Sequence, residues 1–262
     1  LPMTEPAMRI NWIGLRTLYM RESWRFLKVW NQTVIAPMVT TLLFLAILTL
    51  ALGREGRLID GIPYEVFVAP GLIMMTMVQN AFANTSSSLV ISKVQGNIVD
   101  VLMPPLSAAE LFTGYAVGAV TRGVIVGTCT TFVLYFFAPM SFHSIAHIFL
   151  FAILGTFMLG SLGIAAGIWS EKFDHIAAVT NFVVTPMTFL SGTFYSISML
   201  PELWQGIAHF NPFFYMIDGF RYSFIGKADG SITIGLIYLI ILSFVTWFIT
   251  YLLYKKGYKI KS

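Results

Sequence analysis

The chain consists mainly of long apolar runs that are separated by short polar segments. A run of about 20 apolar residues is long enough to cross a bilayer as a helix. The apolar residues are continuous rather than alternating, which argues against the strands of an outer-membrane barrel. The pattern therefore predicts an all-α polytopic membrane protein. The six predicted spans are residues 31–53, 65–91, 109–137, 145–169, 176–197 and 232–254.

The segment before the first span has an amphipathic pattern of its own. Its large apolar residues fall on one helical stripe, while the basic residues lie largely opposite. This predicts an interfacial helix that serves as a membrane anchor or docks a partner. The stripe is Trp12, Leu15, Tyr19, Phe26 and Trp30, and the basic residues are Arg21, Arg25 and Lys28.

Composition supports the membrane assignment, and charge orients the chain. Hydrophobic residues make up 57% of the sequence and charged residues 11%, whereas soluble domains carry about 25% charged residues. The mean hydropathy is +0.78. The net charge of +4 comes from basic residues concentrated before the first span and after the last. By the positive-inside rule we expect both termini in the cytoplasm and no nucleic acid as partner.

Polar residues inside the spans are few and therefore informative. Arg122 lies near the middle of the third span and shares a helical face with Gly114 and Gly118, so we expect it to face protein. It either holds helices in register or borders a transport path. The second span carries a polar patch that either bonds neighbouring helices or lines a pore. The patch is Gln79, Asn80, Asn84 and the run from Thr85 to Ser88.

Several kinds of chemistry are missing from the sequence. There is no phosphate-binding G-x-x-x-x-G-K-[ST] loop and no G-x-S-x-G nucleophile motif, so we expect a chain that is not itself an enzyme. His143 and His147 have metal-pair spacing but no acid or cysteine nearby in sequence. The spans are almost free of acids, which argues against proton-driven transport. We expect no catalytic, cofactor or metal site.

Two connections between spans look specialised. Residues 93–110 form a cytoplasmic loop that is either a connector or a site where a soluble partner transmits force. Residues 198–231 are expected to form two short helices joined at Asn211-Pro212, lying re-entrant or on the membrane surface. In the second of these, Asp218 and Arg221 are three residues apart and able to pair.

The segment "LSGTFYSISMLPELWQGIAHFNPFFYMIDGFR" resembles the signature region of ABC type-2 exporter permeases, the membrane subunits of bacterial polysaccharide, lipid and drug exporters. "APGLIMM" at 69–75 and "GNIVDVLMPPLSAAELFTGYAVGAVTRG" at 96–123 also resemble the family. One departure is Phe213-Phe214, where smaller or polar residues often follow the Asn-Pro. The resemblance covers essentially the whole chain.

The resemblance implies a single permease domain over residues 1–262, with a connecting helix (1–30), spans one to five (31–197), external gate helices (198–231) and span six with a basic tail (232–262). It implies a homodimer in the bacterial inner membrane that carries two copies of a separate ATPase, which bind ATP and magnesium. It implies export of a lipid-linked, polysaccharide or drug-like substrate; an ATP-independent channel or secondary carrier is the alternative. The loop at 93–106 resembles the family's cytoplasmic coupling helix, which docks on the ATPase, and the implied coupling residues are Gly96, Asn97, Asp100, Met103 and Pro104. The implied gate residues are Phe194, Tyr195, Pro201, Asn211, Pro212, Tyr215, Asp218 and Arg221.

Overall fold

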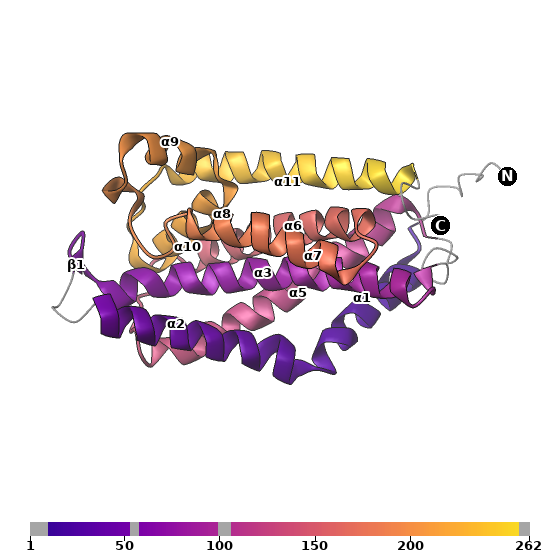
Figure 1. Cartoon of the computed structure of the whole chain (residues 1–262), viewed down its shortest axis with the longest axis horizontal. Helices are drawn as coiled ribbons and strands as arrows, with labels where there is room; N and C mark the ends of the chain where they lie inside the picture. The colour runs from indigo at the N-terminus through magenta and orange to yellow at the C-terminus, as the bar shows by residue number, and fades with distance from the viewer. Residues whose placement is uncertain (1–9, 53–57, 99–105, 257–262) are drawn as a thin grey trace.

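The computed structural model describes residues 10–52, 58–98 and 106–256, which form a bundle of long helices (Figure 1). Within these ranges, five helices are long and apolar enough to cross a membrane. Five of the six predicted spans match their helices to within a few residues at each end, the first when the π-turn before α2 is included. The five helices are α2 (Ala36–Leu52) with the π-turn before it, α3 (Tyr64–Val94), α5 (Ala108–Tyr135), α6 (Ile145–Trp169) and α11 (Ile232–Lys255).

Helix α3 is the centre of the bundle. In its most apolar window 83% of the residues are buried, against 17% for α2 and 22% for α11. Glycines let α5 and α6 approach it closely, because a Cβ on Gly127 would collide with Met77 and one on Gly163 with Thr85. Gly123/Gly127 and Gly163/Gly167 are each spaced i, i+4 in the sequence, a spacing of small residues that favours close helix packing, and both pairs mark tight crossings here.

The predicted fifth span has a different form from the other five. The chain is helical from α7 (Phe173–Val179) through a π-turn (Thr180–Val184) to α8 (Thr185–Phe189), and then turns away. The expected end at residue 197 is wrong, because Gly192 adopts a left-handed φ of 75° and Thr193 Oγ1 donates to the carbonyl of Thr188 at 2.8 Å. These turn contacts end the helix before the apolar sequence ends.

The helix before the first span lies at one end of the bundle, and α9 lies at the other (Figure 1). This first helix, α1 (Trp12–Leu27), begins at Asn11, whose side chain accepts from the Gly14 N–H at 2.9 Å. The C-terminal end of α11 lies at the same end as α1 (Figure 1). Because α5 begins beside α1, the Asn11 N–H donates to Glu110 Oε1 at 2.5 Å.

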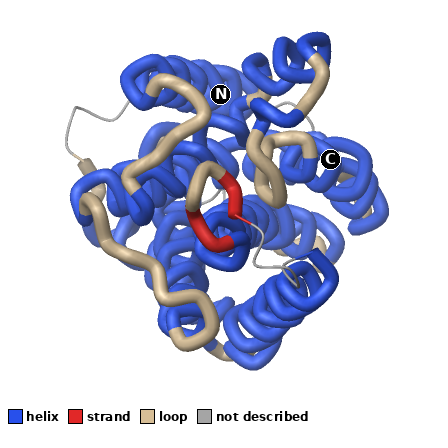
Figure 2. Tube along the Cα trace, turned by 90° about the vertical axis from the view of Figure 1, so that its left-hand side faces the viewer, coloured by secondary structure: helices blue, strands red, loops and turns tan. Residues whose placement is uncertain are grey.

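The segment after α8 folds into two short helices, as predicted. Helix α9 (Glu202–Phe210) is amphipathic and largely exposed, with Leu203 73% and Phe210 81% accessible. Helix α10 (Pro212–Ile225) is instead buried against α3, α6 and α11. A small hairpin of β1 (Leu58–Ile59) and β2 (Ile62–Pro63), not foreseen from the sequence, lies over the middle of the same end in the end-on view (Figure 2).

Candidate functional site

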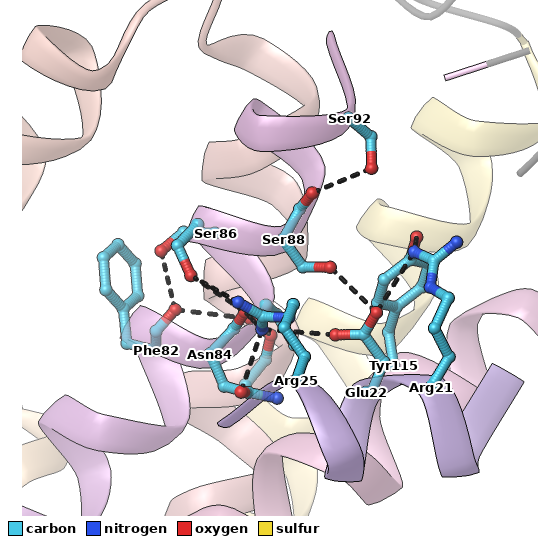
Figure 3. A network of polar contacts seen from close by, with 12 residues as sticks. Arg21, Glu22, Arg25, Phe82, Asn84, Ser86, Ser88, Ser92 and Tyr115 are labelled. Carbon is cyan, nitrogen blue, oxygen red and sulfur yellow. Dashed lines mark hydrogen bonds and ion pairs between the residues drawn. The ribbon is translucent and has the colours of Figure 1, made fainter. Parts of the chain in front are cut away.

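Helix α1 is fastened to the bundle through a buried carboxylate, Glu22, which has no exposed surface. Glu22 accepts hydrogen bonds from Ser88 Oγ at 2.8 Å, from Arg21 Nη2 at 3.2 Å and from Arg25 Nη2 at 3.3 Å (Figure 3). A buried charge is tolerated only where it is paired and hydrogen-bonded. We call Arg21, Glu22, Arg25, Asn84, Ser88 and Tyr115 the α1 network.

Arg25 lies inside this network and bonds to α3, although the sequence pattern only placed it largely opposite the apolar stripe of α1. Its Nη2 donates to the carbonyl oxygen of Asn84 at 2.6 Å and to Asn84 Oδ1 at 3.0 Å, and its Nη1 donates to Ser87 Oγ at 3.2 Å. At the ends of the predicted aromatic stripe Trp12 and Trp30 are exposed, whereas Phe26 is buried. The face that packs on α5 and α3 is formed by Leu18, Glu22, Ser23 and Phe26.

Arg21 closes the network on its exposed side, where its Nη2 donates to the Tyr115 hydroxyl at 3.2 Å. Burial acts to lower the pKa of Arg21, but Tyr115 and Glu22 outweigh it and hold that pKa above its ordinary value. Sequence reasoning missed Glu22. The available signal is its spacing, since Leu18, Glu22 and Phe26 fall at i, i+4 and i+8 on one face.

Arg122 faces protein, as its predicted position in the third span implies. It is 9% exposed, and its Nη2 donates to Asn80 Oδ1 on α3 at 2.9 Å. The neighbouring Gln79 donates to Thr188 Oγ1 on α8 at 3.5 Å. The other polar residues of α3 bond their own helix or adjacent ones, for example Thr85 Oγ1 to the Gly160 carbonyl at 2.8 Å. These contacts join α3 to α5, α6 and α8.

Asp218 and Arg221 do not pair with each other; among the described residues they make no ion pair. Arg221 is buried, and it donates to the carbonyl oxygens of Phe67 at 3.1 Å and Gly192 at 2.6 Å. Its guanidinium also lies 3.9 Å from the centre of the Phe67 ring. Arg221 thus joins α10 to α3 and to the turn after α8.

The Asp218 carboxylate organises the loop that follows α10. Its two oxygens accept from the backbone N–H groups of Asp229 and Gly230, each at 2.9 Å. Burial raises the pKa of Asp218 above its ordinary value, while Arg221 and these two N–H groups act in the opposite sense. Both residues line a pocket of about 460 Å³ at this end of the molecule, together with Asp60, Ile62, Phe67, Gly226, Lys227, Ala228 and Asp229.

The other residues expected at a gate lie on or next to α9 and α10, or in the turn that follows α8. Tyr64 donates its hydroxyl to the Phe194 carbonyl at 3.1 Å, and Tyr195 donates to the Phe189 carbonyl at 3.2 Å. Asn211 begins α10 by accepting from the Phe213 N–H at 3.0 Å, and its Nδ2 donates to the Met187 carbonyl at 2.6 Å. The remaining members are Pro201 before α9, Pro212 at the start of α10 and Tyr215, whose ring lies 5.0 Å from that of Tyr238.

Only part of the expected coupling loop is described. Gly96 follows α3 with a left-handed φ of 73°, where a side chain would be strained, and Asn97 is exposed. Asp100, Met103 and Pro104 lie outside the described residues.

Comparison with known proteins identifies the family. A family profile described as "ABC-2 type transporter" matches residues 14–225, which span α1 to α10. The chain is a member of the ABC-2 type transporter family. This establishes it as a transport subunit of the permease type and a multi-pass membrane protein, in agreement with the resemblance noted in the sequence.

Curated relatives of this ABC-2 transporter subunit match over nearly its whole length. It is 36% identical over 257 residues to the inner membrane transport permease YadH of Escherichia coli K12, covering 97% of this chain and 100% of the relative. It is 25% identical over 251 residues to nodulation protein J of Sinorhizobium fredii NGR234, covering 94% and 93% of the two chains. It is 26% identical over 230 residues to nodulation protein J of Rhizobium leguminosarum bv. viciae, covering 86% of each.

Proposed function

We propose that this chain is the permease subunit of an ATP-driven exporter in the bacterial inner membrane. The observation that carries the proposal is the family match over residues 14–225. The permease name of the Escherichia coli relative supports the inner-membrane location. Since the sequence has no phosphate-binding loop, two copies of a separate ATPase subunit supply ATP and magnesium, and this chain binds no cofactor.

In this proposal two copies of the chain form a homodimer. Each copy has six spans and both termini in the cytoplasm. The fifth span, which adds to the five long helices, is the helical unit from α7 to α8, whose exposed residues include Phe182 at 80% and Val183 at 52%. Such side chains suit contact with lipid. The basic residues before α2 and after α11 support the orientation.

ATP-driven force enters the permease through the loop after α3 and through α1. The coupling residues are Gly96, Asn97, Asp100, Met103 and Pro104. The α1 network supports this role, because the buried Glu22 carboxylate bonds α1 to Ser88 on α3, so that a displacement of α1 is passed on to α3 or breaks this bond. The same network makes α1 more than a passive anchor.

Helices α9 and α10 form the external gate. Their residues gather at the end of the bundle opposite α1, and Arg221 ties α10 to the backbone of two other elements. A lipid-linked, polysaccharide or drug-like substrate passes this end on its way out of the cytoplasm or inner leaflet. The intramembrane polar residues Arg122, Gln79 and Asn80 hold α3, α5 and α8 in register.

Reconstitution with the partner ATPase tests the proposal. We expect no ATP hydrolysis by the purified chain alone, hydrolysis and ATP-dependent export with the partner, and loss of both when Asp100 and Met103 are changed together to alanine. Substrate flux in liposomes without ATP or partner would instead identify an ATP-independent channel or secondary carrier. Unchanged coupling in the double variant would remove the loop from the mechanism while leaving the transport function in place.

A further inference from the structure

Positive charge exceeds negative charge where α1 crosses α3 and α5. Arg21 and Arg25 share the single carboxylate of Glu22. Arg122, one helical turn along α5 from Gly118 at this crossing, has only the neutral Asn80 amide as its hydrogen-bond acceptor. Over residues 10–52, 58–98 and 106–256, no carboxylate lies within ion-pair distance of Arg122. A guanidinium that is 9% exposed is therefore left without a counter-charge.

Hydrogen-bond donors without acceptors gather at the same crossing. In the described part of the chain, Arg122 Nε, Arg25 Nε and Asn84 Nδ2 are buried and have no partner. They are close together, since Arg25 bonds the Asn84 side chain at 3.0 Å, and Asn84 lies one turn along α3 from Asn80, the partner of Arg122. A Cβ on Gly118 would lie 3.7 Å from Asn84 Nδ2 and 2.9 Å from Glu22 Cβ.

All three groups are N–H donors, and leaving buried donors unsatisfied is costly. A water molecule would satisfy some of them but would not balance the charge of Arg122. An anion with several acceptor oxygens does both. The guanidinium group is suited to phosphate, because its fixed fork of N–H donors matches phosphate oxygens in pairs.

The position of α1 indicates where such an anion comes from. Trp12, Trp24 and Trp30 are 68%, 56% and 55% exposed, and exposed tryptophans are typical of the membrane–water interface. Arg25 lies between Trp24 and Trp30, just before the first predicted span. We propose that Arg25, Asn84 and Arg122 bind the phosphate group of an anionic amphiphile that reaches them from the membrane. The site does not depend on whether transport is driven by ATP.

The test is a binding measurement on the isolated full-length chain, without any ATPase. The protein is purified in a neutral maltoside detergent and titrated with dodecyl phosphate or with inorganic phosphate, and bound ligand is counted by native mass spectrometry. We expect one dodecyl phosphate per chain. Arg122→Gln should weaken this binding at least about ten-fold, which corresponds to about 1.4 kcal/mol. The matched control is Arg16→Gln on the exposed face of α1, which should change the affinity less than about two-fold.

The two probes distinguish the sources of the phosphate. Binding of dodecyl phosphate alone identifies a lipid headgroup or an amphiphilic cargo, whereas equal binding of inorganic phosphate identifies a site for the free ion. Where Arg122→Gln does not yield folded protein, Arg25→Gln carries the same test with the same expected loss. The proposal is overturned when wild-type protein binds neither probe, or when the glutamine variant binds as tightly as wild type.

Discussion

At the scale of single residues, the polar side chains of this permease act mainly by bonding to backbone and to each other. Arg221 and Asp218 each satisfy backbone groups of other segments rather than one another. Arg122 was predictable as an inward-facing residue, because a charge in mid-span is too costly against lipid. Its partner Asn80 was not predictable, because several polar residues of the second span lay at a similar depth.

Glu22 offers a test of the α1 network at this scale. Glu22→Gln removes the charge that Arg21 and Arg25 share while keeping the size of the side chain. Because both arginines are partly exposed, we expect a loss of about 1–3 kcal/mol in stability rather than the larger cost of a fully buried pair. Thermal unfolding in detergent measures it. The control Glu202→Gln, on exposed α9, should leave the midpoint unchanged, and equal midpoints for both variants would contradict the assignment.

At the scale of elements, glycine placement decides which helices touch. The small-residue pairs on the third and fourth spans predicted tight crossings, and the structure supplies α3 as their common partner. Hydropathy alone misjudged the end of the fifth span, because the apolar run continues past Phe189 while Thr188, Thr193 and Gly192 bend the backbone.

Gly163 provides a prediction at the element scale. An alanine Cβ there would lie 2.5 Å from the backbone oxygen of Phe82, which has little freedom to move. We expect Gly163→Ala to destabilise the protein by about 1–3 kcal/mol through overpacking. Gly206→Ala is the matched control, since nothing lies within 4 Å of its added Cβ, and it should stabilise α9 by up to about 1 kcal/mol. If the unfolding midpoints of both variants shift in the same direction from wild type, the close α3–α6 contact is refuted.

At the scale of the whole molecule, the α1 network and the α9–α10 helices lie at opposite ends of one bundle (Figure 1), with α3 running between them. This separation is what the proposed function requires, in which force enters at the α1 end and substrate leaves at the α9–α10 end. Helix α3 contacts both ends, through Ser88 to Glu22 and through the Phe67 carbonyl to Arg221.

The proposed gate predicts a separation of transport from nucleotide binding. Arg221→Ala leaves the carbonyls of Phe67 and Gly192 without their hydrogen-bond donor. Asp218→Ala leaves the backbone N–H groups of Asp229 and Gly230 without their acceptor. In the reconstituted complex, we expect each change to lower export at least about ten-fold while the partner still binds ATP. Lys172→Ala, on the exposed start of α7, is the control. Normal export by both gate variants would exclude this role.

Hydropathy and charge were sufficient to predict the membrane class, five of the six spans to within a few residues and the inward position of Arg122, because each depends on local sequence. The family was predicted from short motifs, and the family match bears it out. The tertiary structure decided which side of α1 is buried, where the fifth helix ends and which groups Asp218 and Arg221 bond. These outcomes depend on what lies opposite each side chain. A carboxylate such as Glu22 becomes an internal fastening only when a serine on α3 and two arginines on its own helix meet it out of water.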